Sequence, residues 1–260
     1  MSDFTARYGP WAIVAGASEG LGAAYADALA GRGLNVVLIA RRAAELEARA
    51  ESIRTRFQVQ VKTLSLDLAL PDAPSRVLDA TRELPVGLLV FDAAFSPRGA
   101  FVEVPVASAL KAVDLNVHTM VELTHGIASR LVAQQRGGIV LLSSLTASAG
   151  SPFLATYGAT KAFTATFADA LWLELKPHHV DVLAVLAGAT RTPGFEKASP
   201  QGAPGLLEPS VVAEASLSAL PRGPRFIPGV FNRLASMLMG LMPTRSRLAL
   251  MADQTRKLKS

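Results

Sequence analysis

Tyr157 and Lys161 stand four residues apart in the stretch TYGATK, and only small side chains separate them. Because residues i and i+4 share one face of a helix, the phenol and the ammonium can address the same small volume. A cation beside a phenol favours the phenolate and lowers the phenol's pKa, which suits such a pair to proton transfer. The alternative is an amphipathic Tyr beside a Lys that extends into solvent from a surface helix. The surrounding elements have to decide between the two.

Short apolar runs alternate with helical patterns through most of the chain. The runs are continuously hydrophobic, as is typical of parallel strands that are covered on both faces. The sequence therefore predicts an α/β fold: a single-domain, Rossmann-type doubly wound parallel sheet of about seven strands, with helices on both faces and a ligand site at the strands' carboxyl ends. The runs are residues 11–16, 35–40, 59–66, 87–92, 138–144 and 180–186, and the expected helices lie near 20–32, 43–57, 74–83, 106–135 and 154–176.

The regular alternation ends at Gly188. Residues 188–208 are rich in Pro and Gly, which predicts a substrate loop that can close over a bound ligand. Residues 229–260 have an amphipathic pattern with a basic end and are expected to form a C-terminal helical extension. Within it, the Met-rich segment 237–242 either lines an adaptable apolar pocket or fills the core. We expect residues 1–260 to form one dinucleotide-binding catalytic domain.

Three glycines follow the first predicted strand and precede a helix. Gly16, Gly20 and Gly22 allow a tight turn and a close approach of the backbone to a pyrophosphate, which the helix N-terminus stabilises. A purely structural turn is the alternative. A P-loop is not supported, because no Lys-Ser or Lys-Thr pair follows the last glycine.

Arg41 and Arg42 follow the second predicted strand, at the place where NAD-binding folds carry a carboxylate. A guanidinium there offers several donors to the 2′-phosphate of NADP, so we expect NADP(H) as the cofactor. The other interpretation is that both Arg residues lie at a solvated helix start. Glu19, inside the glycine turn, places an opposing negative charge near the phosphates.

The GxxxGxG turn together with Tyr-xxx-Lys resembles the short-chain dehydrogenase/reductase family, over about residues 10–230. The resemblance implies that Ser144, thirteen residues before Tyr157, hydrogen-bonds the substrate oxygen, with Ser143 as the alternative. It also implies that Asn116, 28 residues before Ser144, holds a water that returns protons from solvent. Tyr157 is then the general acid or base, and Lys161 also binds the nicotinamide ribose.

The same resemblance implies a set of cofactor contacts. Where the family usually has Asn-Asn-Ala-Gly, this chain has Phe91-Asp92-Ala93-Ala94, so no role is carried over to the first two positions. Thr192 matches the family's Thr beside the nicotinamide carboxamide, with Thr190 as the alternative. The complete set is Gly16, Ser18, Glu19, Gly20, Leu21, Gly22, Arg41, Arg42, Asp67, Leu68, Ala93, Ala94, Tyr157, Lys161, Gly188, Thr190 and Thr192.

Three functions fit these residues. The first is an NADP(H)-dependent oxidoreductase that transfers a hydride between nicotinamide and a hydrophobic ketone or secondary alcohol of steroid, fatty-acyl or similar type. The second is a 3-oxoacyl-carrier-protein reductase, whose acidic partner the net charge of +5 would suit. The third is a non-catalytic dinucleotide-binding sensor or scaffold, for which the altered Phe91-Asp92 pair is the main argument.

Composition excludes several other classes. The chain has 260 residues and no Cys, which rules out disulfides and thiolate metal sites, and its basic residues are scattered, which argues against nucleic acid as a partner. No apolar run is long enough for an integral membrane segment, so we expect a soluble, cytoplasmic protein and, by resemblance, a homodimer or homotetramer. His118, Glu122 and His125 share one helical face, which we expect to be packed or interfacial, with no metal bound.

Overall fold

Seven parallel strands form one sheet in the computed structural model, which describes residues 3–199 and 201–256. The strand order is β3-β2-β1-β4-β5-β6-β7. Neighbouring strands pair in parallel throughout, so all carboxyl ends lie at one edge of the sheet. The strands are β1 (Trp11–Ala15), β2 (Asn35–Ala40), β3 (Val61–Ser65), β4 (Val86–Phe91), β5 (Gly137–Ser144), β6 (Val180–Ala187) and β7 (Arg225–Phe226).

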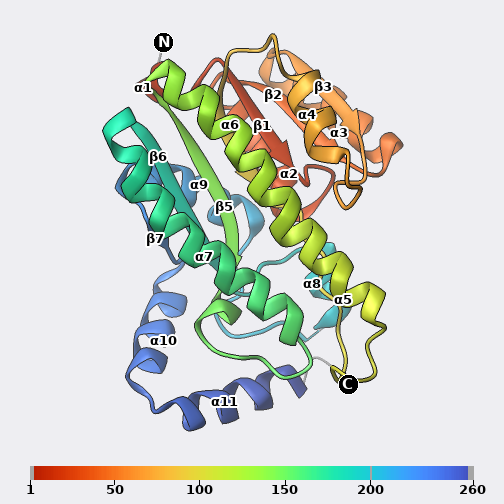
Figure 1. The fold of residues 1–260 in the computed structure, drawn as a ribbon, viewed down its shortest axis with the longest axis vertical. Helices are drawn as coiled ribbons and strands as arrows, with labels where there is room; N and C mark the ends of the chain where they lie inside the picture. The colour runs from red at the N-terminus through yellow and green to blue at the C-terminus, as the bar shows by residue number, and fades with distance from the viewer. Residues whose placement is uncertain (1–2, 200, 257–260) are drawn as a thin grey trace.

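Helices connect the strands and cover both faces of the sheet. In Figure 1, α6 and α7 cross in front of the sheet, and α2 and α9 lie behind it. The helices are α1 (Asp3–Tyr8), α2 (Gly20–Ala30), α3 (Ala43–Phe57), α4 (Ala73–Ala80), α5 (Val106–Val113), α6 (Met120–Gln134), α7 (Ala155–Leu175), α8 (Pro193–Ala198), α9 (Pro209–Ala219), α10 (Val230–Leu241) and α11 (Thr244–Arg256). Short 3-10 turns cover Leu145–Ser148, Lys176–His178 and Leu220–Arg222, and a π-helical segment covers Asp114–Thr119.

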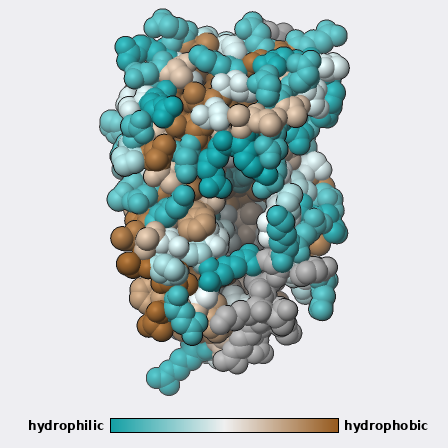
Figure 2. Space-filling view, turned by 90° about the vertical axis from the view of Figure 1, so that its right-hand side faces the viewer, coloured by the Kyte–Doolittle hydropathy of each residue, from teal (hydrophilic) through white to brown (hydrophobic). Residues whose placement is uncertain are grey.

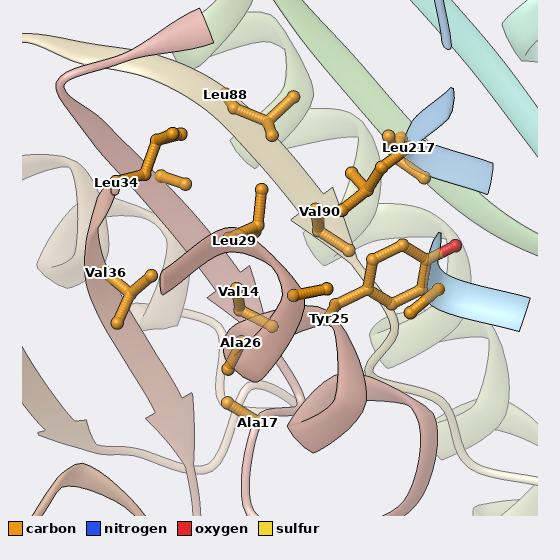
Figure 3. Packing of buried hydrophobic residues seen from close by; sticks show 14 of the residues in the cluster. Val14, Ala17, Tyr25, Ala26, Leu29, Leu34, Val36, Leu88, Val90 and Leu217 are labelled. Carbon is orange, nitrogen blue, oxygen red and sulfur yellow. The ribbon is translucent and has the colours of Figure 1, made fainter. Parts of the chain in front are cut away.

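The core consists of two layers, one on each face of the sheet. Successive strand side chains point to opposite faces, so Val14 packs with α2 and α9 while Ile13 packs with α6 and α7. Figure 3 shows the first layer, in which Leu29 and Tyr25 of α2 lie against Val14 and Val90, with Leu217 of α9 close by. Burial on both faces explains why the strands read as unbroken hydrophobic runs.

The fold class predicted from the sequence is confirmed, and each of the six predicted strands lies within two residues of an observed one. The seventh strand, β7, has only two residues and therefore shows no periodicity to recognise. The helix expected over residues 106–135 is divided into α5 and α6 by the π-helical segment. Such a segment holds one more residue per turn than an α-helix and often marks a functional position.

The sheet order reverses between β1 and β4, which is where a doubly wound fold binds its ligand. Helices α10 and α11 lie at the same end of the molecule as the strands' carboxyl ends (Figure 1). None of the helices in the described part of the chain has both the length and the apolar character needed to cross a bilayer.

Candidate active site

A cleft of about 660 Å³ opens at the carboxyl ends of the strands. Figure 2 shows the molecule hollowed near mid-height, between a largely hydrophilic upper part and a lower part with hydrophobic side chains at its left edge. The lining comes from the glycine turn, from the ends of β2, β4, β5 and β6, and from the first turns of α7 and α8. One cleft thus collects segments from most of the chain.

The glycine turn is packed too tightly for side chains at two of its positions. Gly16 has a φ of +97°, and a Cβ there would lie 2.7 Å from the amide nitrogen of Ala93. A Cβ on Gly22 would lie 2.1 Å from the carbonyl oxygen of Gly16. The turn therefore passes directly over the end of β4 and aims the N-terminus of α2 into the cleft. This is the geometry that a pyrophosphate needs.

The two arginines at the end of β2 differ in their partners. Arg42 donates from Nη2 to Oε2 of Glu19 at 2.7 Å and pairs with Glu45 at 3.2 Å. Arg41 is exposed and forms no ion pair with any residue in the described part of the chain. The negative charge of Glu19 is therefore balanced by Arg42, and Arg41 keeps its guanidinium available for a phosphate.

Tyr157 and Lys161 lie on adjacent turns at the start of α7, as their spacing predicts. Lys161 is only 5% exposed, and its Nζ donates to the carbonyl oxygen of Leu142 in β5 at 2.6 Å. The same Nζ lies 5.6 Å from the centroid of the Tyr157 ring. Burial lowers the pKa of the Lys161 ammonium to about 8, against an opposing influence of Asp92. This Lys is anchored in the site and does not extend into solvent.

Ser143 and Ser144 are separated by the alternation of side chains at the end of β5. The hydroxyl of Ser143 is buried and donates to the carbonyl oxygen of Lys161 at 2.7 Å. Ser144 caps the following 3-10 turn, where its hydroxyl accepts from the amide of Thr146 at 3.2 Å, and it keeps its proton for another acceptor. Of the two, Ser144 therefore has the hydroxyl that can serve a substrate.

Burial raises the pKa of the Tyr157 phenol to about 12, and the nearby carboxylate of Asp92 also raises it. A hydrogen bond with Ser144 and the charge of Arg98 act in the opposite direction. The sequence predicts that Lys161 is the group that lowers this pKa. In the structure that influence comes from Ser144 and Arg98, while the Lys161 ammonium is directed at the Leu142 carbonyl.

Asn116 lies in the π-helical segment, behind the cleft, and is 2% exposed. Its Oδ1 accepts from the amide of Phe95 at 2.8 Å, and its Nδ2 donates to the carbonyl of Phe95 and to Oγ1 of Thr160, both at 3.0 Å. The side chain thus ties the loop after β4 to α7 and supports the cleft from behind. Its role in holding a water stays a prediction.

The loop over residues 188–208 is fastened at its base. The amide of Leu207 donates to the carbonyl of Ala189 at 3.0 Å, and the amide of Arg191 donates to the carbonyl of Leu207 at 2.9 Å. Thr192 caps α8 by accepting from the amide of Phe195, and its Cγ2 would lie 3.0 Å from a Cβ on Gly20. The loop therefore reaches across to the glycine turn. Residue 200 of this predicted loop and residues 257–260 of the predicted extension lie outside the described residues.

Most of the predicted site residues line this single cleft. Gly22 and Asn116 do not, since Gly22 supports the turn from within α2 and Asn116 lies behind the wall. The predicted residues that line it are Gly16, Ser18, Glu19, Gly20, Leu21, Arg41, Arg42, Asp67, Leu68, Ala93, Ala94, Ser144, Tyr157, Lys161, Gly188, Thr190 and Thr192.

Several residues that line the cleft cannot be predicted from the sequence. Arg98 and Lys111 follow β4 without any motif, and Phe195 lies in the Pro and Gly-rich loop. At Asp92 the sequence shows a departure from the family's Asn but predicts no role for the side chain. Asn232 of α10 is also missed: it is 4% exposed, and its Nδ2 donates to the carbonyl of Gly205 at 3.0 Å, which holds the loop to α10.

The face with His118, Glu122 and His125 is exposed, so the expectation of a packed face is wrong for the single chain. His118 pairs through Nδ1 with Asp114 at 3.2 Å, one turn earlier on the same helical surface. The sequence pattern looks like a set of metal ligands only because residues at this helical spacing share one face of the helix, whether or not they bind a common ion.

Comparison with known proteins decides the family. The short chain dehydrogenase family matches residues 10–202, and a 7β-hydroxysteroid dehydrogenase of Mediterraneibacter gnavus is 32% identical over 199 residues, 76% of each chain. The chain belongs to the short chain dehydrogenase family. Its members act as oxidoreductases on hydroxyl and carbonyl groups, so the protein is an enzyme of that class.

Two solved structures are similar over nearly the whole chain. One, reported in a study of 7β-hydroxysteroid dehydrogenase stereoselectivity, has a TM-score of 0.91 and 28% identity and covers 96% of this chain and 99% of that one. The other is a short-chain dehydrogenase from Sphingobium yanoikuyae in complex with NADPH, with a TM-score of 0.80 and 30% identity, covering 93% and 95%. This short chain dehydrogenase therefore shares nearly all of its architecture with the first of them.

Replacement of Ser144 by Ala should lower kcat/KM by about 10²–10³, because it removes a donor to the oxygen that becomes negative during reduction. The matched control is Ser143→Ala on the same strand. It should cost about 1 kcal/mol in the free energy of unfolding through the lost bond to Lys161, with a much smaller fall in kcat/KM. Steady-state kinetics and urea unfolding of both variants test this pair, and a larger kinetic loss for Ser143→Ala would reverse the assignment.

Proposed function

We propose that this short chain dehydrogenase is an NADP(H)-dependent oxidoreductase that interconverts a hydrophobic ketone and the corresponding secondary alcohol. The observation that carries the proposal is that Tyr157, Lys161 and Ser144 line the same cleft as the glycine turn and the unpaired Arg41. The cofactor fits this chain. Because Gly16 and Gly22 carry no side chains, the turn packs closely and the backbone amides at the N-terminus of α2 stay accessible to a pyrophosphate.

Each residue has a part that follows from its chemistry. When bound, the nicotinamide supplies the hydride for reduction or accepts it in oxidation. Tyr157 gives its phenolic proton to the substrate oxygen during reduction and takes it back during oxidation. Ser144 donates a hydrogen bond to that oxygen and so stabilises the charge that develops on it. Lys161 holds a positive charge beside the phenol and binds the nicotinamide ribose, as the family resemblance implies.

The substrate end of the cleft supports a lipophilic compound of steroid or fatty-acyl type. Leu154, Phe95 and Phe195 contribute apolar surface there, and the loop over residues 188–208 provides a wall that reaches the glycine turn. The similarity to a 7β-hydroxysteroid dehydrogenase supports a steroid in particular. The exposed Arg98, whose charge reaches Tyr157, offers a partner for a negatively charged group on such a substrate.

Reduction of a 3-oxoacyl group on an acidic carrier protein has weaker support. That activity calls for several basic side chains around the substrate end of the cleft. Among the basic side chains that line the cleft in the described residues, Arg41 and Arg42 belong to the adenosine end and Lys161 is buried. Lys111 is paired with Asp67 at 3.5 Å, which leaves Arg98 alone at the substrate end. A non-catalytic sensor is opposed by the presence of Ser144, Tyr157 and Lys161 together in the cleft.

We also propose that residues 1–260 act as one catalytic domain in the cytoplasm, as a homodimer or homotetramer. Self-association is supported by exposed apolar side chains that gather on α10, which association would remove from water. These are Val230, Phe231, Leu234, Met237, Leu238 and Leu241.

Replacement of Tyr157 by Phe should lower kcat by about 10²–10⁴ and leave the Kd for NADPH within about threefold, because it removes only the phenolic hydroxyl that carries the proton. The control is Tyr8→Phe, whose hydroxyl donates to Oδ2 of Asp181 at 2.6 Å, away from the cleft. NADPH absorbance with a panel of lipophilic ketones measures turnover. Activity of Tyr157→Phe equal to that of Tyr8→Phe would rule out the proposed mechanism.

Replacement of Arg41 by Ala should raise the Kd for NADPH by about 10- to 100-fold, since hydrogen bonds to a charged group are worth about 1.5–3 kcal/mol. The Kd for NADH should change far less. Arg42→Ala is the matched control and should have a smaller effect, because Arg42 already pairs with Glu19. Fluorescence titrations measure the Kd of each variant for both cofactors. An equal rise in Kd for NADPH and NADH would contradict the cofactor assignment.

Light scattering coupled to size exclusion should give a mass of two or four times that of one chain. Replacement of Phe231 and Leu238 by Ser should shift this mass towards one chain if α10 forms the contact, because it adds polar groups to an apolar interface. A wild-type mass equal to one chain would exclude self-association.

A further inference from the structure

Asp92 lies between the glycine turn and the catalytic helix. Its backbone is fixed where β4 ends, because the amides of Asp92 and Ala93 donate to the carbonyl of Ala15 at 2.9 and 2.8 Å. Its carboxylate faces α2, with Oδ2 only 3.0 Å from the position of a Cβ on Gly22. The residue also lines the cleft. One acidic side chain thus contacts the first turn of α2 at the place where a pyrophosphate would bind.

Charged and titratable groups face this carboxylate from both helices. From α7 come Lys161 and Tyr157, and from α2 come the amide of Gly22 and the buried Tyr25. Burial raises the pKa of Asp92 to about 6, while Lys161 and the Gly22 amide lower it. In return, the carboxylate raises the pKa of Tyr157 and of Lys161.

We propose that Asp92 is a positioning residue that couples cofactor binding at the N-terminus of α2 to the protonation of the Tyr157–Lys161 pair. This rests on the proposed use of NADP(H). A pyrophosphate and the Asp92 carboxylate are both anions that are stabilised by the same positive helix end. Bound phosphate therefore disfavours the ionised form of Asp92, and the carboxyl takes up a proton at pH values near its own pKa of about 6.

Proton uptake at Asp92 has a consequence on α7. Once the carboxyl is neutral, the negative charge that holds up the pKa of Tyr157 is gone, so the phenol becomes a better proton donor when the cofactor is in place. The Asn that the resembled family usually carries here has the same shape and no charge to lose. The replacement of this Asn by Asp92 therefore makes cofactor binding and the protonation of Tyr157 depend on pH.

Replacement of Asp92 by Asn tests the coupling, because it keeps the shape of the side chain and removes its charge. At about pH 8, where wild-type Asp92 is ionised, Asp92→Asn should bind NADPH about 3- to 10-fold more tightly. The two affinities should converge below about pH 6, where wild-type Asp92 is protonated. Calorimetry near pH 6, in buffers of different ionisation enthalpy, should show more proton uptake on NADPH binding by the wild type than by Asp92→Asn. The 2′-phosphate titrates equally in both and cancels in the comparison.

The matched control is Asp27→Asn, which removes a carboxylate from the same helix, α2, outside the cleft. Asp27 pairs with Arg49 and Arg56, away from Lys161. This variant should show the wild-type proton uptake and the wild-type pH profile of alcohol oxidation. In Asp92→Asn that profile should move to lower pH, because the phenolate forms more readily once the carboxylate is absent.

A measurement without cofactor tests the charge state of Asp92 separately from the proposed function. A carboxyl whose pKa is higher in the fold than in the unfolded chain costs stability as it ionises, so the cost is present above about pH 6 and absent below about pH 4. The melting temperature of Asp92→Asn should therefore exceed that of the wild type at about pH 8, and the difference should shrink towards about pH 5.

Two negative results would have different meanings. Tight NADPH binding with equal proton uptake and parallel affinity curves in the wild type and Asp92→Asn would overturn the coupling alone. No NADPH binding by the wild type would overturn the proposed function, and the coupling with it, even if the melting temperatures behaved as expected.

Discussion

A buried ammonium organises this active site. Lys161 is almost completely enclosed, and its Nζ donates to the carbonyl of Leu142, which ties α7 to β5. Burial of an unpaired charge is costly, so the position requires an acceptor and a nearby carboxylate, which Leu142 and Asp92 supply. Because α7 is held by this bond, Tyr157 one turn earlier is fixed above the end of the sheet. Ser143 adds a second tie by donating to the Lys161 carbonyl.

The cofactor end depends on a different constraint, the close passage of the backbone over itself. Gly16 and Gly22 leave no room for side chains between the turn, β4 and α2, so only glycine allows the helix N-terminus to face the cleft. The two arginines at the end of β2 differ in whether they form ion pairs. Glu19 occupies Arg42, and Arg41 stays open towards solvent and phosphate. The two ends meet at Asp92, which lies beside the glycine turn and under the influence of α7.

Periodicity and motif spacing predict much of this protein. Buried parallel strands leave continuous apolar runs, so six of the seven strands are visible in the sequence, while β7 is too short to leave a pattern. The spacing of Ser144, Tyr157 and Lys161 places them at one strand end and on one helix face, and the structure brings them to one cleft. The identity of these elements follows from local rules.

Other features depend on contacts between distant segments and cannot be read locally. The break in the helix over residues 106–135 holds Asn116, whose bonds to Phe95 and Thr160 cannot be predicted from the pattern of the helix. Arg98 influences Tyr157 from a loop without a motif, and Asn232 supports the substrate loop from α10. The direction of the Lys161 ammonium, towards Leu142, also depends on how α7 packs on β5.

The central claim is that this cleft transfers a hydride between NADP(H) and a lipophilic carbonyl compound. NADPH that carries deuterium at either face of the transferred position tests this most directly, with cyclic and long-chain ketones as acceptors and mass spectrometry of the alcohol products. The account predicts that one of the two labelled cofactors places deuterium on the carbinol carbon, and that Tyr157→Phe forms this product far more slowly. Tight NADPH binding without labelled alcohol from any ketone in the panel would contradict it.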